Sequence, residues 1–280
     1  MNTQTPLDPF ETALLAELRR VVQQGSARRH RGRDLLAAAA VLAVVGLGAT
    51  WLLPSDDSNP LAPREAAAAT VLTQAAEAAA DRPAGQGIYW HTSMVRTYPL
   101  GDQTGGNGRV DQAWVRKDGI HWFRYGDGPI KRDPESQGFR VCDKGVDYEA
   151  LAALPAEPTE LRAALARLMR NNDDGPVPSD AQQAFVTACT VDLLSLLPVS
   201  PAVRAAGFRS LIAQPGAKNL GPAVDGRGRH GTELEFPDGD DTLRVILDPT
   251  TGLLLQSESG TKGNTARTLE LEAGWTNTLG

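Results

Sequence analysis

The chain contains 280 residues with 34 acidic and 28 basic side chains, and its formal net charge is −6. Six arginines and four acidic residues give residues 1–34 a net charge of +2, which leaves −8 for the remainder. This acidic remainder argues against nucleic acid or anionic lipid headgroups as a partner of the domain, because phosphate groups attract surfaces rich in Lys and Arg.

Residues 8–24 are predicted to form a short amphipathic helix. Asp8 occupies the N-cap position, Pro9 follows it, and Glu11 completes the spacing of a capping box. Apolar side chains recur on one stripe of this helix, and its main members are Phe10, Leu14, Leu18 and Val21. We expect a cytoplasmic protein to cover this stripe; the alternative is a helix that lies on the membrane surface.

The segment Leu35–Leu53 has nineteen residues without a charge, which is long enough to cross a bilayer as a helix. Four arginines precede it closely: Arg28, Arg29, Arg31 and Arg33. By the positive-inside rule, residues 1–34 face the cytoplasm and the C-terminal part lies across the membrane. The sequence therefore predicts a single-pass protein of a bacterial cytoplasmic membrane, with its N-terminus inside.

A cleaved signal peptide is the alternative interpretation of this segment. Gly46-Leu47-Gly48 offers a small-x-small cleavage site. However, the 34 residues before the apolar segment are longer than the basic leader of an ordinary signal peptide. If the helix is retained, Gly46 and Thr50 form a small-xxx-small pair that favours a homodimer.

A linker at 54–63 and one extracytoplasmic domain at 64–280 are expected to follow. Helical spacing predicts helices at 64–81, 158–170, 179–197 and 201–216. Alternating apolar and polar residues predict strands at 88–98, 110–117, 120–125, 139–142, 220–225, 232–236, 243–248, 253–258 and 268–273. This order of elements favours an α+β fold, in which an antiparallel sheet packs on helices.

The two cysteines, Cys142 and Cys189, both fall in the part predicted to lie outside the membrane, where disulfides persist. We expect a disulfide between them, and two buried free thiols are the alternative. A zinc site is not expected, because no histidine accompanies the two distant cysteines.

No motif in the chain indicates an enzyme. Gly226–Gly231 matches G-x-G-x-x-G, but a strand follows it where a dinucleotide site needs a helix, so we interpret it as a turn. His91 and His121 lie on predicted strands and could be neighbours, as a metal or proton-sensing pair or as ordinary strand histidines. The acidic cluster Asp238–Asp241 is interpreted as a solvated hairpin tip. No catalytic, cofactor-binding or metal-binding residue is therefore assigned.

Aromatic side chains concentrate on the first predicted strands. They could line a groove for an apolar ligand, or they could pack in the core between sheet and helix. The candidate groove residues are Trp90, Trp114, Trp122 and Phe123.

Several motifs resemble known families. The hairpin Leu247–Leu255, with its Asp-Pro-Thr-Thr-Gly turn, and the strand start Gly85–Tyr89 resemble LolA-like lipoprotein carriers and RseB-like regulators of extracytoplasmic-function sigma factors. The arginine-flanked span, together with Thr159–Leu165, Val199–Ala206 and the turn before Gly231, is similar to a family of actinobacterial one-pass membrane proteins often encoded beside such sigma factors. The resemblance implies a LolA/RseB-like sheet and carries over no catalytic residue.

From these patterns we expect a non-enzymatic sensor or regulator. Its outer domain would bind a lipid, a lipoprotein or an envelope protein, and its helix at 8–24 would contact a cytoplasmic partner, which the resemblance suggests is a sigma factor. The first alternative is a membrane-anchored carrier of lipids or lipoproteins. The second is an envelope hydrolase that uses His91 or His121 with an acidic partner.

Overall fold

The computed structural model describes residues 62–98, 108–135, 138–142, 144–169, 179–261 and 264–280. All of them belong to one compact unit, Ser55–Gly280. The helix expected at 8–24, the apolar segment 35–53 and nearly all of the linker lie outside the described residues, as do Phe10, Leu14, Leu18 and Val21. Among the residues that are described, no helix is long and apolar enough to span a membrane.

The described elements alternate between helical and extended blocks. The helices are α2 (Ala62–Asp81), α3 (Tyr148–Ala152), α4 (Pro158–Met169), α5 (Ser179–Leu196) and α6 (Pro201–Ile212). The first block of strands comprises β1 (Tyr89–Thr97), β2 (Val110–Arg116), β3 (His121–Tyr125), β4 (Lys131–Asp133), β5 (Phe139–Val141) and β6 (Lys144–Val146). The second comprises β7 (Lys218–Val224), β8 (His230–Asp238), β9 (Asp241–Asp248), β10 (Leu253–Thr261) and β11 (Asn264–Thr276).

Nine of the described strands form one antiparallel sheet in the order β4-β3-β2-β1-β11-β10-β9-β8-β7. Strand β11 therefore joins two meanders, one from each end of the domain, by pairing with both β1 and β10. The predicted α+β class, an antiparallel sheet packed on helices, is confirmed.

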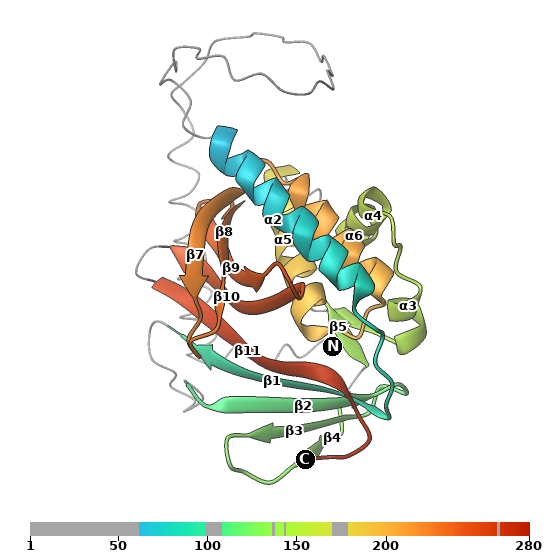
Figure 1. The fold of residues 1–280 in the computed structure, drawn as a ribbon. Helices are drawn as coiled ribbons and strands as arrows, with labels where there is room; N and C mark the ends of the chain where they lie inside the picture. Colours follow the sequence, from blue (N-terminus) through green and yellow to red (C-terminus); the bar gives the residue numbers. More distant parts are fainter. Residues whose placement is uncertain (1–61, 99–107, 136–137, 143, 170–178, 262–263) are drawn as a thin grey trace, which may run out of the picture. The chain divides into compact units, whose positions relative to one another are not determined.

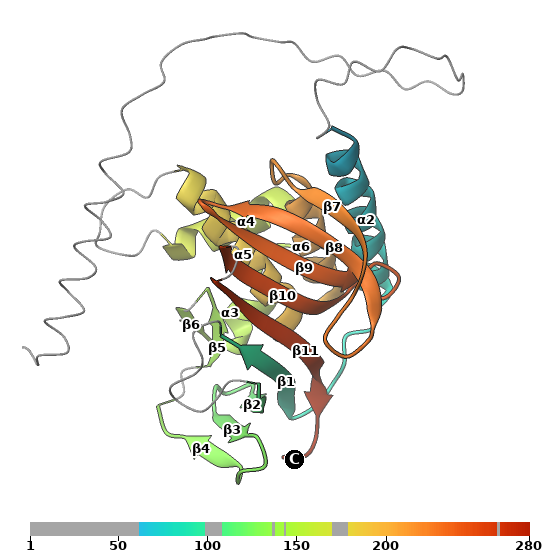
Figure 2. The ribbon, with the colours of Figure 1, turned by 90° about the vertical axis from the view of Figure 1, so that its left-hand side faces the viewer.

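The helices cover one face of this sheet (Figures 1 and 2). Helix α5 packs on β8, β10 and β11, while α2 packs against α6 and the edge strand β7. Large apolar side chains fill the space between these layers, and the fully buried ones include Leu72, Leu165, Leu193, Phe208, Leu234 and Phe236. Strands β2, β3 and β4 extend beyond the helices as a wing of the sheet (Figure 1).

Local chemistry sets the start of helix α6. The hydroxyl of Ser200 accepts a hydrogen bond from the Val203 backbone amide, and Pro201 occupies the first turn, where no amide is needed. The helix ends at Ile212, before the residue 216 expected from the sequence, and Gly216 follows with φ of +76°.

Three short elements were missed in the sequence, namely β4, β6 and α3. Strand β5 at 139–141 pairs only with β6, as a separate two-stranded sheet, and is not part of the main sheet. Elements of three to five residues are too short to show a periodic pattern, so none could be recognised for them.

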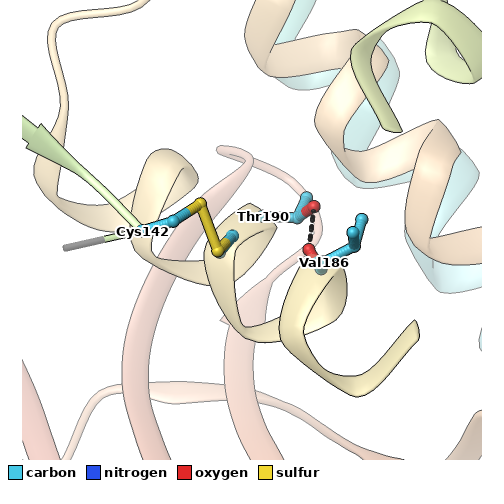
Figure 3. The surroundings of a disulfide bond; sticks show 4 residues. Cys142, Val186 and Thr190 are labelled. Carbon is cyan, nitrogen blue, oxygen red and sulfur yellow. Dashed lines mark hydrogen bonds between the residues drawn. A yellow bond between two sulfur atoms is a disulfide. The ribbon is translucent and has the colours of Figure 1, made fainter. Parts of the chain in front are cut away.

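A disulfide joins Cys142, at the end of β5, to Cys189 on α5, with a Cα–Cα distance of 5.0 Å (Figure 3). The bond expected from the sequence is therefore present. Beside it, the buried Thr190 hydroxyl donates to the Val186 carbonyl at 2.7 Å, so α5 carries this polar group without an unpaired hydrogen. The disulfide fastens the small hairpin β5–β6 to the helix that covers the main sheet.

Candidate functional site

The main sheet divides between β10 and β11. The pairing of these strands runs from Thr261–Asn264 to Gln256–Leu269 and stops there. Beyond that point β10 continues along β9, while β11 continues along β1. Each strand also has a bulge at the division, with Leu255 unpaired on β10 and Leu271 unpaired on β11. The result is a fork in the sheet.

Arg229, from the β7–β8 turn, closes the apex of this fork. One of its guanidinium nitrogens donates to the carbonyl of Leu255 at 3.0 Å and also to the carbonyl of Glu270. The β10–β11 ladder ends before both residues, so this one side chain bridges the two strands where they separate. The guanidinium is held in turn by Asp225, whose side chain is fully buried.

A cavity of about 230 Å³ lies on the helix side of the fork, and we call it the fork cavity. Its apolar lining comes from the sheet and from the end of α5: Trp90, Leu194, Leu197, Leu253, Leu254 and Leu271. Its charged lining is Arg82, Arg204, Arg229, Glu270 and Glu272. An apolar wall with a few convergent charged groups is typical of a small-molecule site.

Arg204 on α6 is the most unusual charge in this lining. Its side chain is only 8% exposed, and it donates to the Val199 carbonyl at 3.1 Å. Within the described residues, no carboxylate forms a salt bridge with it. Burial first, and the nearby positive charge of Arg82 second, lower the pKa of Arg204 to about 10. A buried cation without a counter-ion costs folding free energy unless something neutralises it.

Glu270 on β11 adds a titratable carboxyl to the same cavity. It is 8% exposed, and none of the described residues forms a hydrogen bond with its carboxyl group. Burial is the largest cause that raises the pKa of Glu270, to about 7; Asp192 raises it further, and Arg96 and Arg229 oppose the rise. This carboxyl therefore changes its charge in the neutral range.

Trp90 connects the cavity to the core. Its indole nitrogen donates to the Leu196 carbonyl at 2.7 Å, which pairs the last turn of α5 with β1. Its ring meets Trp275 edge to face, with centroids 5.6 Å apart. The indole is therefore a fixed part of the cavity wall.

The four aromatic residues predicted to line a groove do not line a common one. Directly paired residues of antiparallel strands share a face, and Trp114 pairs with both His91 and Trp122. Trp90 lies on the opposite face. Phe123 shares the face of Trp90 but packs against Tyr125 in the wing, with ring centroids 5.0 Å apart. Only Trp90 lines the fork cavity.

His91 and His121, considered as neighbours, lie on opposite faces of the sheet. His91 stacks on Trp114 with centroids 4.7 Å apart, and its Nδ1 lies 3.9 Å from Glu272. His121 lies on β3 opposite Val115, on the face of Trp90, and its Nε2 contacts the Gly138 carbonyl. Because they lie on opposite faces, they cannot form the metal or proton-sensing pair considered for them.

The remaining motifs are structural where the chain is described. The segment Asp225–Gly231 forms the β7–β8 turn and the start of β8, as expected, with Asp225 accepting from the backbone amides of Arg227 and Arg229. Asp238–Asp241 forms the β8–β9 turn, also as expected. No group of three metal-ligating side chains occurs among the described residues.

No pattern in the sequence indicated that Arg204, Arg229 and Glu270 line a common site. If β11 had no bulge, alternation would place Glu270 and Glu272 together on the solvent face. The bulge between them moves Glu270 to the helix face, whereas the Glu272 side chain stays 70% exposed. No residue type marks this bulge in advance, so the sequence carried no usable signal for it.

Comparison with known proteins finds similarity to solved structures only. No protein-family model matches the chain, and no curated protein matches it significantly. The chain is similar to MucB in complex with MucA(peri), with a TM-score of 0.31 and 16% identity over 75% of this chain and 57% of MucB. A second MucB structure gives 0.30 and 16%, over 75% of this chain and 58% of that one.

LprF from Mycobacterium bovis gives a TM-score of 0.29 and 9% identity, over 78% of this chain and 97% of LprF. The chain thus spans less than three fifths of the length of MucB. Similarity at these TM-scores supports no conclusion about the function of this chain. The function of the fork cavity is therefore inferred below from the residues that line it.

Proposed function

We propose that this chain is a non-enzymatic binding protein of the cell envelope, and that the fork cavity holds an amphipathic anion. The apolar walls would take the hydrocarbon part of the ligand, and Arg204 and Arg82 would face its acidic group. A lipid with an acidic head group or a fatty acid has this chemistry. The disulfide Cys142–Cys189 supports an extracytoplasmic site, because such bonds persist in oxidising compartments.

The observation that carries this proposal is the unpaired, buried charge of Arg204. A structural arginine at this depth normally forms a salt bridge with a carboxylate, and none of the described carboxylates forms one with Arg204. A bound anion would provide the missing counter-charge, and the surrounding apolar surface would strengthen that interaction. Arg229 is not equivalent, since Asp225 already neutralises it.

The test is to purify the full chain in mild detergent and identify bound small molecules by native mass spectrometry and solvent extraction. We expect an anionic amphiphile in the wild type and its loss in Arg204→Gln. The matched control is Arg209→Gln, because Arg209 is an exposed arginine on the same helix. An empty wild type that also fails to bind an added anionic amphiphile would overturn the proposal.

The regulatory part of the proposal rests on the sequence. A membrane-spanning segment at 35–53 would connect the binding domain to the helix at 8–24, whose stripe would engage a cytoplasmic partner such as a sigma factor. Leu14→Asp with Leu18→Asp should abolish that interaction and leave the fork cavity occupied. If deletion of residues 1–24 leaves function intact, the carrier alternative is favoured over the regulator.

A further inference from the structure

We propose that Glu270 makes ligand binding in the fork cavity depend on protonation, so that binding of the anion is coupled to proton uptake and loss of the proton favours release of the anion. This inference deepens the proposed function and rests on it. It concerns the regulation of the site by pH, which the contacts of Arg204 alone do not imply.

The geometry places opposed charges around one small volume. Arg204 and Glu270 line the same cavity, each is 8% exposed, and no described carboxylate or cation forms a salt bridge with either. An anion held at Arg204 would occupy the cavity that Glu270 also lines. If Glu270 is ionised, two negative groups share a poorly solvated site; if it is protonated, its hydroxyl can donate a hydrogen bond to the ligand.

Charged groups on three other elements act on Glu270, and Glu272 on its own strand also lines the cavity. Asp192 on α5 is negative and favours the protonated carboxyl, whereas Arg96 on β1 and Arg229 from the β7–β8 turn favour the ionised form. Arg229 is already engaged by Asp225 and two backbone carbonyls. The segment of β10 at the fork adds only Leu253 and Leu254 to the cavity lining.

The balance of these groups supports the proposal. Burial and Asp192 together outweigh the two arginines, and the pKa of Glu270 is raised to about 7. The carboxyl is therefore half protonated near neutral pH without a ligand. A bound anion adds another negative charge beside it and raises this pKa further, so binding draws a proton from the solvent.

The test uses the full chain in dodecyl maltoside and isothermal titration calorimetry with octyl sulfate, which stays anionic throughout the range used. Titration into detergent alone is the blank, and 1-octanol is the ligand without the charge. If only the protonated site binds, the Kd of octyl sulfate for the wild type should rise about tenfold from about pH 6 to about pH 8. The Kd of 1-octanol should stay constant.

Glu270→Gln should bind octyl sulfate with a Kd that stays within about twofold over the same range, because the amide mimics the neutral carboxyl. The control is Glu233→Gln, since Glu233 is a half-exposed carboxylate of β8 outside the cavity, and it should retain the wild-type dependence. Titration near neutral pH in buffers of different ionisation enthalpy should show proton uptake in the wild type only, compared with Glu270→Gln.

The outcomes separate the two proposals. Octyl sulfate binding that depends on Arg204 but not on pH overturns the role of Glu270 and leaves the proposed function standing. A pH dependence that persists in Glu270→Gln also overturns that role. Absence of octyl sulfate binding at every pH overturns the proposed function and this inference with it. Circular dichroism of each variant verifies that the domain is folded.

Discussion

The carboxylate of Asp225 accepts a hydrogen bond from Nε of Arg229 at 2.6 Å, within a single five-residue turn. The same carboxylate also accepts from the backbone amides of Arg227 and Arg229, at 2.9 and 2.8 Å. This arrangement aims the guanidinium across β9 at the carbonyls of β10 and β11. The turn at 225–229 thereby positions Arg229 to bridge β10 and β11 at the point where these strands separate.

Asp225→Asn should destabilise the domain by about 2 kcal/mol, because the buried arrangement loses its charge and one strong acceptor. Asp248→Asn is the control, since Asp248 also accepts from its own turn at Thr250 and Thr251 but lies at an exposed site. Urea denaturation of the full chain followed by circular dichroism measures both. Equal losses for the two variants would contradict a special role for the Asp225–Arg229 pair.

Because of the Asp225–Arg229 pair, we expect the stability of the domain to depend on pH in the acid range. Burial raises the pKa of Asp225, but the hydrogen bonds from Arg229 and from the Arg227 amide outweigh it, so the pKa lies below its usual value. The stabilisation is then present above the pKa of an unfolded Asp and is lost as the pH falls through the folded value. The difference in stability between the wild type and Asp225→Asn should therefore shrink in strong acid.

The pKa of Glu270 shifts on folding in the direction opposite to that of Asp225. Its folded pKa of about 7 lies above the ordinary value of 4.5, so folding binds the proton more tightly and its ionisation costs stability as the pH rises. Glu270→Gln should therefore be more stable than the wild type at about pH 8, by up to about 3 kcal/mol, and equal to it at about pH 5. Urea denaturation at the two pH values decides this; a destabilised variant at the higher pH would be inconsistent with a buried, unpaired carboxyl.

The Cys142–Cys189 disulfide predicts a mass lower than that of the reduced chain by two hydrogen atoms. In the chain-entropy model, closing a loop of this size contributes about 4 kcal/mol, and the double variant Cys142→Ala with Cys189→Ala should lose most of that. Mass spectrometry with and without reductant tests the bond, and urea denaturation tests its contribution. A reductant that leaves the wild-type denaturation midpoint unchanged would argue against a stabilising bridge.

Trp90→Phe should keep the aromatic packing with Trp275 but leave the Leu196 carbonyl without its donor. We expect a loss of about 1 kcal/mol in stability, the usual contribution of one hydrogen bond. Trp122→Phe is a suitable comparison, because Trp122 lies in the wing and forms no hydrogen bond through its indole within the described residues. Octyl sulfate titration of Trp90→Phe should show whether the cavity wall also weakens.

The sequence predicted the fold well wherever a period was long enough to recognise. The helix at 158–170 and the strands around the Asp118-Gly119 turn have nearly the expected bounds, because helical spacing marks the helix and the Asp-Gly turn marks where the two strands meet. The turn Asp225–Gly231 was also expected. The hydrophobic pattern could not indicate that Arg229 donates to the carbonyls of Leu255 and Glu270. These residues lie on strands that become its neighbours only after the sheet has formed.

The candidate site was beyond the sequence for a similar reason. Trp90 was singled out together with Trp114 and Trp122, but the strand register pairs Trp90 with Val115, the neighbour of Trp114. Trp114 and Trp122 therefore lie on the opposite face, and the group could not share a groove. Glu270 looked like a solvent-facing glutamate because alternation holds only for an unbroken strand. One extra residue in a ladder reverses the face of every residue after it.

The position of β11 has a consequence for biogenesis. The strand that lies between the two meanders is synthesised after every other strand of the described sheet, so neither meander can complete its hydrogen bonds on an elongating chain. Both would wait with an open edge, at β1 and at β10, which are surfaces prone to aggregation. A cell making this protein would need a chaperone or rapid export to protect those edges until the central strand arrives.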